Sequence, residues 1–275
     1  MDFKKVLGQY NISLYILCSL WLIFSASAAK ALDVNDVNKT DRATGLIMTD
    51  AKAYPKAVFE DAKKTFINRD NILLLLLAGG GSIAFRETGI DDRAADHFSE
   101  NGKMSKDLDK LIDVAGCPGT HFAAAGIWYL IAANKKDDVN LQRSWIMFKA
   151  LSINGAMTLT LKAAVRDHSP NDKDWAWPSG HTSSSFCAAA VLDEFYGPKI
   201  GIPAYMGAGL VGYRMMESGD HWASDVLFGA VLGYIVGHTV AGPNKELTLG
   251  GFKIQPMVTS LHSSPAAGIG LEKRF

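Results

Sequence analysis

The sequence predicts an all-α protein built as a helical bundle, with a C-terminal tail that suits a short β-hairpin. Five apolar, helix-compatible segments follow residue 119, and proline, glycine or charged residues separate them. They lie near residues 120–134, 141–166, 182–196, 200–216 and 223–241. Few stretches show the valine, isoleucine and threonine alternation that is typical of strands. The tail, residues 244–275, differs because it contains short strand-like runs with turn residues between them.

Length and composition fit one large domain, or one domain with appendages. Hydrophobic residues make up 48% of the 275 residues and charged residues 20%, so a packed core can form. The 28 basic and 28 acidic residues cancel. No global basic field indicates nucleic acid, and no acidic excess indicates disorder. We therefore expect no nucleic-acid partner.

The N-terminus carries the pattern of an export signal. Lys4 and Lys5 precede residues 12–29, which are free of charge, and the small residues that follow suit signal peptidase. Residues 1–31 are therefore predicted to be a secretory signal peptide. An uncleaved membrane anchor is the alternative, because the apolar run approaches the ~20 residues that span a bilayer. Either interpretation places the rest of the chain outside the cytoplasm, in the periplasm or at a membrane.

Two segments precede the five apolar ones. Residues 32–70 are polar and predict a flexible lead-in, followed by an amphipathic helix near residues 53–66. The predicted helical domain covers residues 71–243. Its first, leucine-rich helix is expected to loosen or end at the three glycines 79–81, because glycine disfavours helix. A charged helix is expected near residues 91–97.

The apolar segments are short for membrane spans. The best candidate, residues 226–241, is shorter than the ~20 residues required and contains His238. The mean hydropathy of +0.06 is also low for a protein with many spans. The pattern favours buried helices of a globular periplasmic bundle and leaves membrane association open.

Cys117 and Cys187 remain once the signal peptide is removed. In an oxidising compartment they could form a disulfide, and two small buried residues are the other interpretation. No cysteine or histidine–carboxylate cluster has the spacing of metal ligands, so the sequence predicts no metal site.

A turn before one helix predicts an anion-binding position. Pro178-Ser-Gly-His181 breaks the chain just before a helical run, so Ser179, Gly180 and His181 fall near a helix N-terminus. Free N–H groups and the positive end of the helix dipole suit an oxyanion there. Lys162 and Arg166 are four residues apart on a predicted helix, so both cations face the same way.

His221 and Asp225 are also four residues apart, at the start of the last helix, and Arg214 lies near the end of the preceding one. The carboxylate can accept a hydrogen bond from one imidazole nitrogen, which leaves the other nitrogen free to attack. Phosphoryl transfer requires such a nucleophile, an acid for the departing alkoxide, and cations around the equatorial oxygens. Any one of these histidines alone is more simply a packed or surface residue, but their combination predicts phosphoryl chemistry.

The stretch from Lys162 to about Gly233 resembles the type 2 phosphatidic acid phosphatase and vanadium haloperoxidase superfamily. The motifs of that superfamily are K-x6-R-P, P-S-G-H and S-R-x5-H-x3-D. Residues 178–181 match the second motif fully, and residues 221–225 match the end of the third.

The resemblance implies a helical bundle of this superfamily's type. It implies that His221 is the nucleophile that forms a phosphohistidine, that Asp225 orients it, and that His181 is the general acid. No cofactor is implied for the phosphatase members. The implied phosphate ligands are an arginine together with Lys162, Ser179 and Gly180.

Both arginines of the superfamily pattern are out of register. Seven residues after Lys162 the chain has Ser169. Arg166 is therefore expected to reach the phosphate from one turn earlier, on about the same helix face. Arg214 precedes His221 by seven residues, one more than the pattern, and a deformable turn between them could absorb the shift.

The predicted function is metal-independent hydrolysis of a phosphate monoester or pyrophosphate, with a lipid phosphate among the candidate substrates. The alternatives are a non-catalytic phosphate-binding or structural protein of the same fold, which the shifted arginines support, and a vanadate-dependent haloperoxidase. The expected partner is a phosphorylated small molecule or lipid, and the sequence does not indicate an oligomeric state.

Overall fold

The computed structural model describes residues 37–102, 104–242, 248–249, 252–261 and 264–273, with side chains between Thr49 and Gly242. The predicted signal peptide, residues 1–31, lies outside these residues and stays a prediction.

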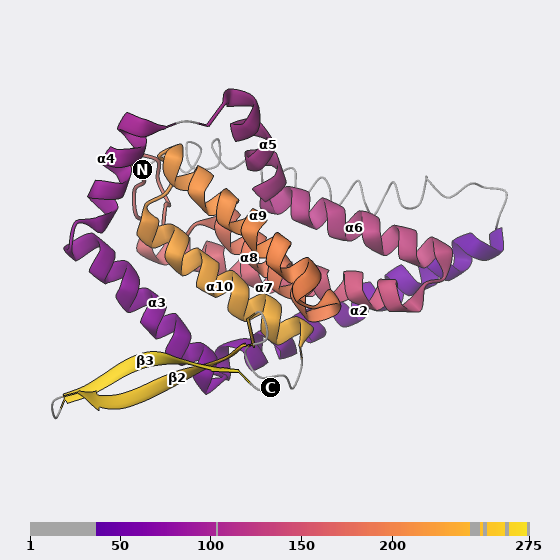
Figure 1. Ribbon diagram of the computed structural model, residues 1–275. Helices are drawn as coiled ribbons and strands as arrows, with labels where there is room; N and C mark the ends of the chain where they lie inside the picture. Colours follow the sequence, from indigo (N-terminus) through magenta and orange to yellow (C-terminus); the bar gives the residue numbers. More distant parts are fainter. Residues whose placement is uncertain (1–36, 103, 243–247, 250–251, 262–263, 274–275) are drawn as a thin grey trace.

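The described chain is a bundle of helices followed by a small sheet (Figure 1). The helices are α2 (Val37–Ile67), α3 (Arg69–Glu87), α4 (Ile90–Asn101), α5 (Lys106–Gly116), α6 (Pro118–Lys135), α7 (Asp138–Val165), α8 (Gly180–Tyr196), α9 (Pro198–Glu217) and α10 (Ala223–Ala241). The strands are β1 (Thr248–Leu249), β2 (Phe252–Leu261) and β3 (Ser264–Lys273). The prediction of an all-α helical bundle is confirmed for the part of the chain that forms the core.

The tail pairs in the order β1-β2-β3, and both pairs of neighbours are antiparallel. In the longer pair, Phe252 lies opposite Lys273 and Leu261 lies opposite Ser264. The hairpin predicted from sequence falls on this segment, most of whose side chains lie outside the described residues.

α2 begins earlier than predicted. A flexible lead-in was expected before a helix near residues 53–66, whereas the helix already begins at Val37. Pro55 lies inside it.

The three glycines 79–81 do not end α3, contrary to the prediction, and the helix continues to Glu87. The reason is the contact of Gly79 and Gly81 with α10. A Cβ added to Gly81 would lie 3.2 Å from a methyl group of Leu227, and a Cβ added to Gly79 would lie 3.9 Å from the ring of Phe228. The missing side chains let α3 approach α10 closely, and the packing offsets the weak helix propensity of glycine.

α5 was not predicted from the sequence. Its N-cap is Ser105, whose hydroxyl accepts a hydrogen bond from the backbone N–H of Leu108 at 3.3 Å. Asp107 and Asp109 lie in its first turn, where the helix dipole favours negative charge. α5 brings the carboxylates of Asp109 and Asp113 toward the start of α8 and the end of α9.

α8 and α10 form the centre of the bundle and touch backbone to backbone. Three glycines of α10, four residues apart, face α8: Gly229, Gly233 and Gly237. A Cβ on Gly233 would lie 2.0 Å from the carbonyl oxygen of Ser183, and one on Gly237 would lie 2.4 Å from that of Cys187. No side chain fits at these distances, so only glycine permits this packing. We call this contact the glycine seam.

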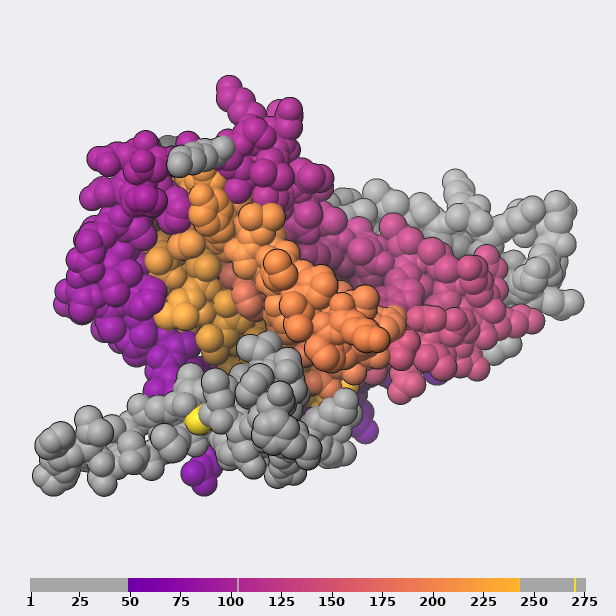
Figure 2. Space-filling model, in the orientation of Figure 1, coloured from indigo at the N-terminus to yellow at the C-terminus, as the bar shows by residue number. Residues whose placement is uncertain are grey.

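Large apolar side chains complete the core around the glycine seam, among them the fully buried Leu151, Val191, Leu232 and Val236. On the face shown in Figure 2, α9 lies at the surface, with α3 and α4 on one side of it and α5 and α6 on the other. Cys117 and Cys187 are both free thiols, so no disulfide joins them. Cys187 is buried, as the alternative interpretation expected, whereas Cys117 is only partly buried.

Among the described helices, α10 alone is long and apolar enough to cross a membrane. α3 and α4 meet the same criterion only when taken together, and they are bent by 67° at the break between them. Most of α10 is buried among the other helices, as is also true of a core helix in a soluble bundle.

Candidate active site

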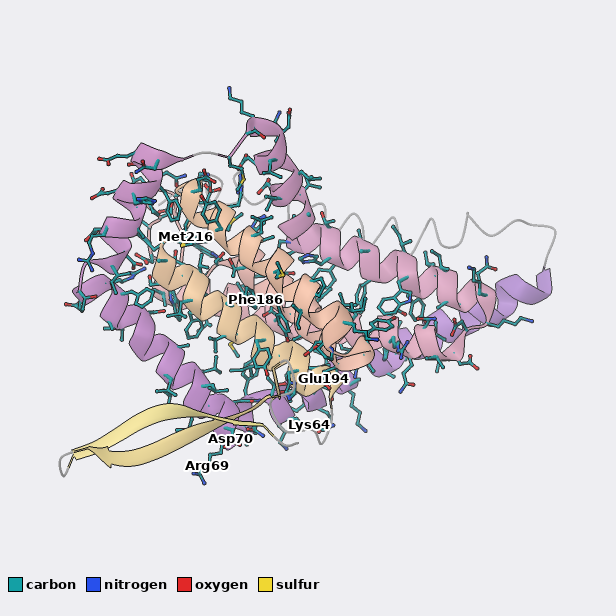
Figure 3. The ribbon with its side chains drawn as sticks, in the orientation of Figure 1. Lys64, Arg69, Asp70, Phe186, Glu194 and Met216 are labelled. Carbon is teal, nitrogen blue, oxygen red and sulfur yellow. The ribbon has the colours of Figure 1, made fainter. Side chains whose placement is uncertain are left out.

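Four helix ends meet at one end of the bundle and carry the predicted site residues. α7 and α9 end there, and α8 and α10 begin there. Figure 3 shows the direction: Met216 of α9 lies near this end, and Glu194 of α8 lies near the opposite one. Residues far apart in the sequence are therefore collected at the ends of consecutive antiparallel helices.

His221 and Asp225 form the predicted pair. Nδ1 of His221 lies 3.2 Å from Oδ2 of Asp225, and the carboxylate is fully buried. The backbone N–H of Trp222 donates to the same oxygen at 3.1 Å. Asp225 lies in the first turn of α10, where the helix dipole stabilises its negative charge. Nδ1 is therefore the protonated nitrogen, and Nε2 keeps a lone pair.

Burial lowers the pKa of His221, and the hydrogen bond to Asp225 acts in the opposite direction. The charge of Lys162 lowers this pKa further. The ring is therefore neutral at physiological pH, as a nucleophile must be.

The turn before α8 is tied directly to α10. Ser179 is the N-cap of α8, and its backbone N–H donates to the carbonyl oxygen of Asp225 at 3.1 Å. Its hydroxyl accepts from the N–H of Thr182 at 3.4 Å. A Cβ on Gly180 would lie 3.9 Å from Cε of Lys162, so the first residue of α8 faces the lysine side chain. The N-terminus of α8 and the side chain of Lys162 therefore lie next to each other.

Lys162 is buried and held by backbone carbonyl groups. Its Nζ donates to the carbonyl oxygen of Ala176 at 2.9 Å and also to that of Trp175. Trp175 adopts a φ of 66°, in the left-handed region that costs free energy for a residue with a side chain. Burial lowers the pKa of Lys162 to about 8, against the charge of Asp225, which raises it. The lysine remains a cation at neutral pH.

His181 lies in the first turn of α8 and is partly exposed. Its Nε2 lies 3.6 Å from Oδ1 of Asp113 on α5. Burial lowers the pKa of His181 to about 4, and the charge of Asp113 opposes that shift. His221 and Arg214 also lower it, so both lie within electrostatic reach of His181.

Arg214 reaches this region, but carboxylates already engage its guanidinium. Nε donates to Asp109 at 2.7 Å, and Nη1 lies 3.0 Å from Asp113 and 3.1 Å from Asp220. Although burial alone lowers it, these carboxylates raise the pKa of Arg214. Asp109 and Asp113 were missed in the sequence because α5 itself was not predicted.

Arg166 does not lie where it was predicted. α7 ends at Val165, and Arg166 adopts the left-handed conformation, with a φ of 56°. Its exposed side chain bends back, and Nε donates to the carbonyl oxygen of Ala163 at 3.0 Å. The expected helix face shared by Lys162 and Arg166 does not form, because α7 ends before Arg166. Within the described residues, no contact joins Arg166 to the two histidines.

Arg86 of α3 enters the site and was not identified in the sequence. Its Nη2 donates to Oδ1 of Asp225 at 3.3 Å and also to Asp167. Its Nε lies 3.4 Å from Oγ of Ser224 and 3.7 Å from Asp91. Nothing in the local pattern around Arg86 indicated this role. Asp167, Ser224 and Asp225 are brought to it by tertiary packing, and Asp91 alone of these partners is near in the sequence.

The chain is similar to known proteins in sequence and in fold. The sequence model of the PAP2 superfamily matches residues 93–242. A lipid A 1-phosphatase from Porphyromonas gingivalis is 38% identical over 65 residues, which make up 22% of this chain and 15% of that protein. This chain therefore covers only a small part of that relative's length.

A solved structure of a transmembrane PAP2-type phosphatidylglycerolphosphate phosphatase from Bacillus subtilis aligns over 64% of this chain and 96% of the solved chain. Its TM-score is 0.49 and its identity is 17%. The matched residues 93–242 cover more than half of the 275 residues and include both histidines of the site. The chain belongs to the PAP2 superfamily.

Proposed function

We propose that this protein is a phosphatase that hydrolyses a phosphate monoester or pyrophosphate through a phosphohistidine at His221. The observation that carries the proposal is the buried contact of 3.2 Å between Nδ1 of His221 and Asp225. It leaves Nε2 as a neutral nucleophile beside a cation and a helix N-terminus.

In the first step, Nε2 of His221 forms a bond to phosphorus while the bond from phosphorus to the leaving oxygen breaks. The imidazole then carries positive charge, which Asp225 stabilises through Nδ1–H. His181 gives its proton to the departing alkoxide. In the second step, water attacks the phosphohistidine, His181 takes the proton from that water, and inorganic phosphate leaves.

Charge in the site supports this division of roles. Lys162 and the N-terminal N–H groups of α8 face the position of the equatorial oxygens. A bound phosphate dianion adds negative charge beside His181 and raises its pKa above the value of about 4 that burial imposes. Binding of the substrate therefore favours the protonated form of the acid.

We also propose a lipid phosphate as the substrate and a location at a membrane outside the cytoplasm. The relative from Porphyromonas gingivalis acts on lipid A by its description, which supports this choice. Large apolar side chains are exposed next to the site on α5, the same helix that carries Asp109 and Asp113: Leu108, Leu111 and Val114. α9 exposes a stripe at helical spacing, formed by Ile202, Met206, Leu210 and Tyr213. Such a surface suits contact with lipid.

Phosphate release tests the activity. Purified wild type and His221→Ala are compared on a lipid phosphate in mixed vesicles and on a soluble aryl phosphate. We expect release by the wild type, faster from the lipid, and none above background from His221→Ala. Equal rates for the two proteins would rule out His221 as the nucleophile of a phosphatase. Faster turnover of the soluble ester would rule out the lipid proposal alone.

One observation favours a second candidate, a phosphate-binding protein without catalysis. Arg214 already contacts three carboxylates, and Ser169 stands where the superfamily has an arginine. A protein of this kind would bind inorganic phosphate or vanadate tightly in calorimetry and release no phosphate from any ester.

A further inference from the structure

Arg86 occupies a position that neither superfamily arginine explains. It lies on α3, before residues 93–242 that match the superfamily. Within the described residues, it is the arginine that contacts the carboxylate of the nucleophile pair. Arg214 is engaged by the carboxylates of α5, and Arg166 is exposed at the end of α7.

The two oxygens of Asp225 have separate donors. Oδ2 accepts from Nδ1 of His221 and from the N–H of Trp222, whereas Oδ1 accepts from Nη2 of Arg86 at 3.3 Å. Asp225 is fully buried. Without Arg86, its Oδ1 would be a buried charged oxygen that loses this cationic partner. The arginine therefore determines which oxygen faces the imidazole.

Arg86 is itself fixed from two other elements. Asp167, just after α7, pairs with Nη2, and Asp91 at the start of α4 lies 3.7 Å from Nε. Asp91 also accepts from the N–H of Ser224 at 2.9 Å and from its hydroxyl at 2.6 Å. Since Ser224 precedes Asp225, the same network holds the first turn of α10.

We propose that Arg86 is a positioning residue of the catalytic site, acting on His221 through Asp225. It holds Oδ2 toward Nδ1, which keeps the proton on Nδ1 and the lone pair on Nε2. This inference rests on the proposed phosphatase function for its kinetic consequences. Its structural content, the state of the His221 imidazole, can be measured without any turnover.

Three variants carry the test. Arg86→Ala removes the guanidinium, and Arg86→Lys keeps the charge but loses the fork geometry. Arg93→Ala is the matched control, since Arg93 lies on the neighbouring α4 and donates to the backbone carbonyl of Thr88 at 3.0 Å. Circular dichroism and thermal melting establish that each variant folds. If Arg86→Ala does not fold, Arg86→Gln, which also removes the cation, takes its place in the same measurements.

The first readout is the titration of His221 by nitrogen-15 NMR, with its signals assigned by their loss in His221→Ala. Removing a cation from the pair favours the imidazolium, so the midpoint for His221 moves to higher pH in Arg86→Ala. The side chain of Arg86 is 37% exposed, so added guanidinium ion can enter the gap and reverse the shift. An unchanged titration, or a shift equal to that of Arg93→Ala, overturns the inference.

The second readout is kinetic. We expect Arg86→Ala to lower kcat roughly 10-fold with KM nearly unchanged, and the acidic limb of the pH profile to move to higher pH. In an Asp225→Asn background, the same change should cost less than about twofold, because the arginine has lost its charged partner. Full additivity of the two changes would show that Arg86 acts elsewhere.

The two proposals fail separately. A wild-type protein that hydrolyses no phosphate ester removes the phosphatase function, and the His221 titration still decides whether Arg86 controls the imidazole. Conversely, an active wild type with an unaltered titration and pH profile in Arg86→Ala keeps the function and removes the role of Arg86.

Discussion

The two histidines of the site each face a carboxylate, but the two pairs are built differently. His221 and Asp225 lie on one short stretch of chain at the start of α10, 3.2 Å apart, and the carboxylate is 0% exposed. His181 of α8 faces Asp113 of α5 at 3.6 Å, and the Asp113 side chain is 44% exposed. The first pair is fixed within one short stretch of chain that leads into α10, whereas the second depends on how α5 packs.

This difference suits the two roles. A nucleophile needs one tautomer and one direction of attack throughout the reaction, which a local and buried pair provides. An acid must gain and lose a proton in each cycle, and a partly exposed pair can respond to substrate and solvent. If the two pairs differ in this way, substitutions at Asp225 and at Asp113 should change activity by different amounts and with different pH dependence.

The largest effect is expected at the local pair. Asp225→Asn keeps the shape of the side chain but offers an amide group to Nδ1 and removes the charge that stabilises the imidazolium. We expect kcat to fall about 10³- to 10⁴-fold, as for comparable changes beside a catalytic histidine. Steady-state kinetics measure this loss. More than a tenth of wild-type activity would mean that Asp225 does not orient His221.

The next effect concerns the contact between the helices that carry the two histidines. Gly233→Ala forces a methyl group to within 2.0 Å of the carbonyl oxygen of Ser183, so α8 and α10 must separate. We expect a loss of about 3 kcal/mol in the free energy of unfolding, measured by urea denaturation.

Gly80→Ala is the matched control for that change. It also places alanine in a helix, and no described atom lies within 4 Å of the added methyl group. Its free energy of unfolding should stay equal or rise by up to about 1 kcal/mol. Similar losses in both variants would argue against the close contact of α8 and α10.

A smaller effect is expected at the second pair. The charge of Asp113 raises the pKa of His181, so Asp113→Asn lowers that pKa. Because the acid must be protonated, the alkaline limb of the kcat profile moves to lower pH, with a loss of about 10-fold on that limb. Asp107→Asn, on the exposed side of the same helix, is the control.

A gain in activity in Asp113→Asn would reverse this interpretation. It would mean that Asp113 competes with phosphate for Arg214 and that its contact with His181 has no catalytic role. The pH–rate profile separates the two outcomes. Loss of the competing Asp113 carboxylate would raise the affinity for the phosphate group at every pH and would not move the alkaline limb.

The smallest effect is expected at Arg166. Since its side chain is exposed and bonded to its own helix end, Arg166→Ala should change kcat/KM less than twofold. A loss of 10-fold or more would show that the arginine moves into the site when substrate is bound.

The parts of the site that could be predicted are those encoded locally. The spacing of four between His221 and Asp225 places the two side chains close together at the start of one helix, and the turn at Pro178 requires a helix to begin near Gly180. Neither conclusion depends on knowing which helices are neighbours. The bundle itself was predictable for the same reason, because the length and breaks of the apolar segments determine helices one at a time.

The parts that could not be predicted depend on contacts across the chain. Arg86 and Asp225 are 139 residues apart in the sequence, and Arg214 and Asp109 are 105 apart. Local pattern also failed where packing overrode propensity, as at the glycines of α3. It failed again at Arg166, a residue other than glycine that ends α7 in the left-handed conformation.

The glycine seam has a mechanical consequence for the site. Because the spacing of α8 and α10 is set by backbone atoms in contact, no rotation of a side chain can widen it. His181 lies in the first turn of α8 and His221 immediately precedes the N-cap of α10, so the two imidazoles move together as parts of one stiff body. Compliance is left to α5, which meets α8 and α9 through the side chains of Asp113 and Asp109. We expect substrates of different bulk to displace α5 while the reacting groups keep their separation.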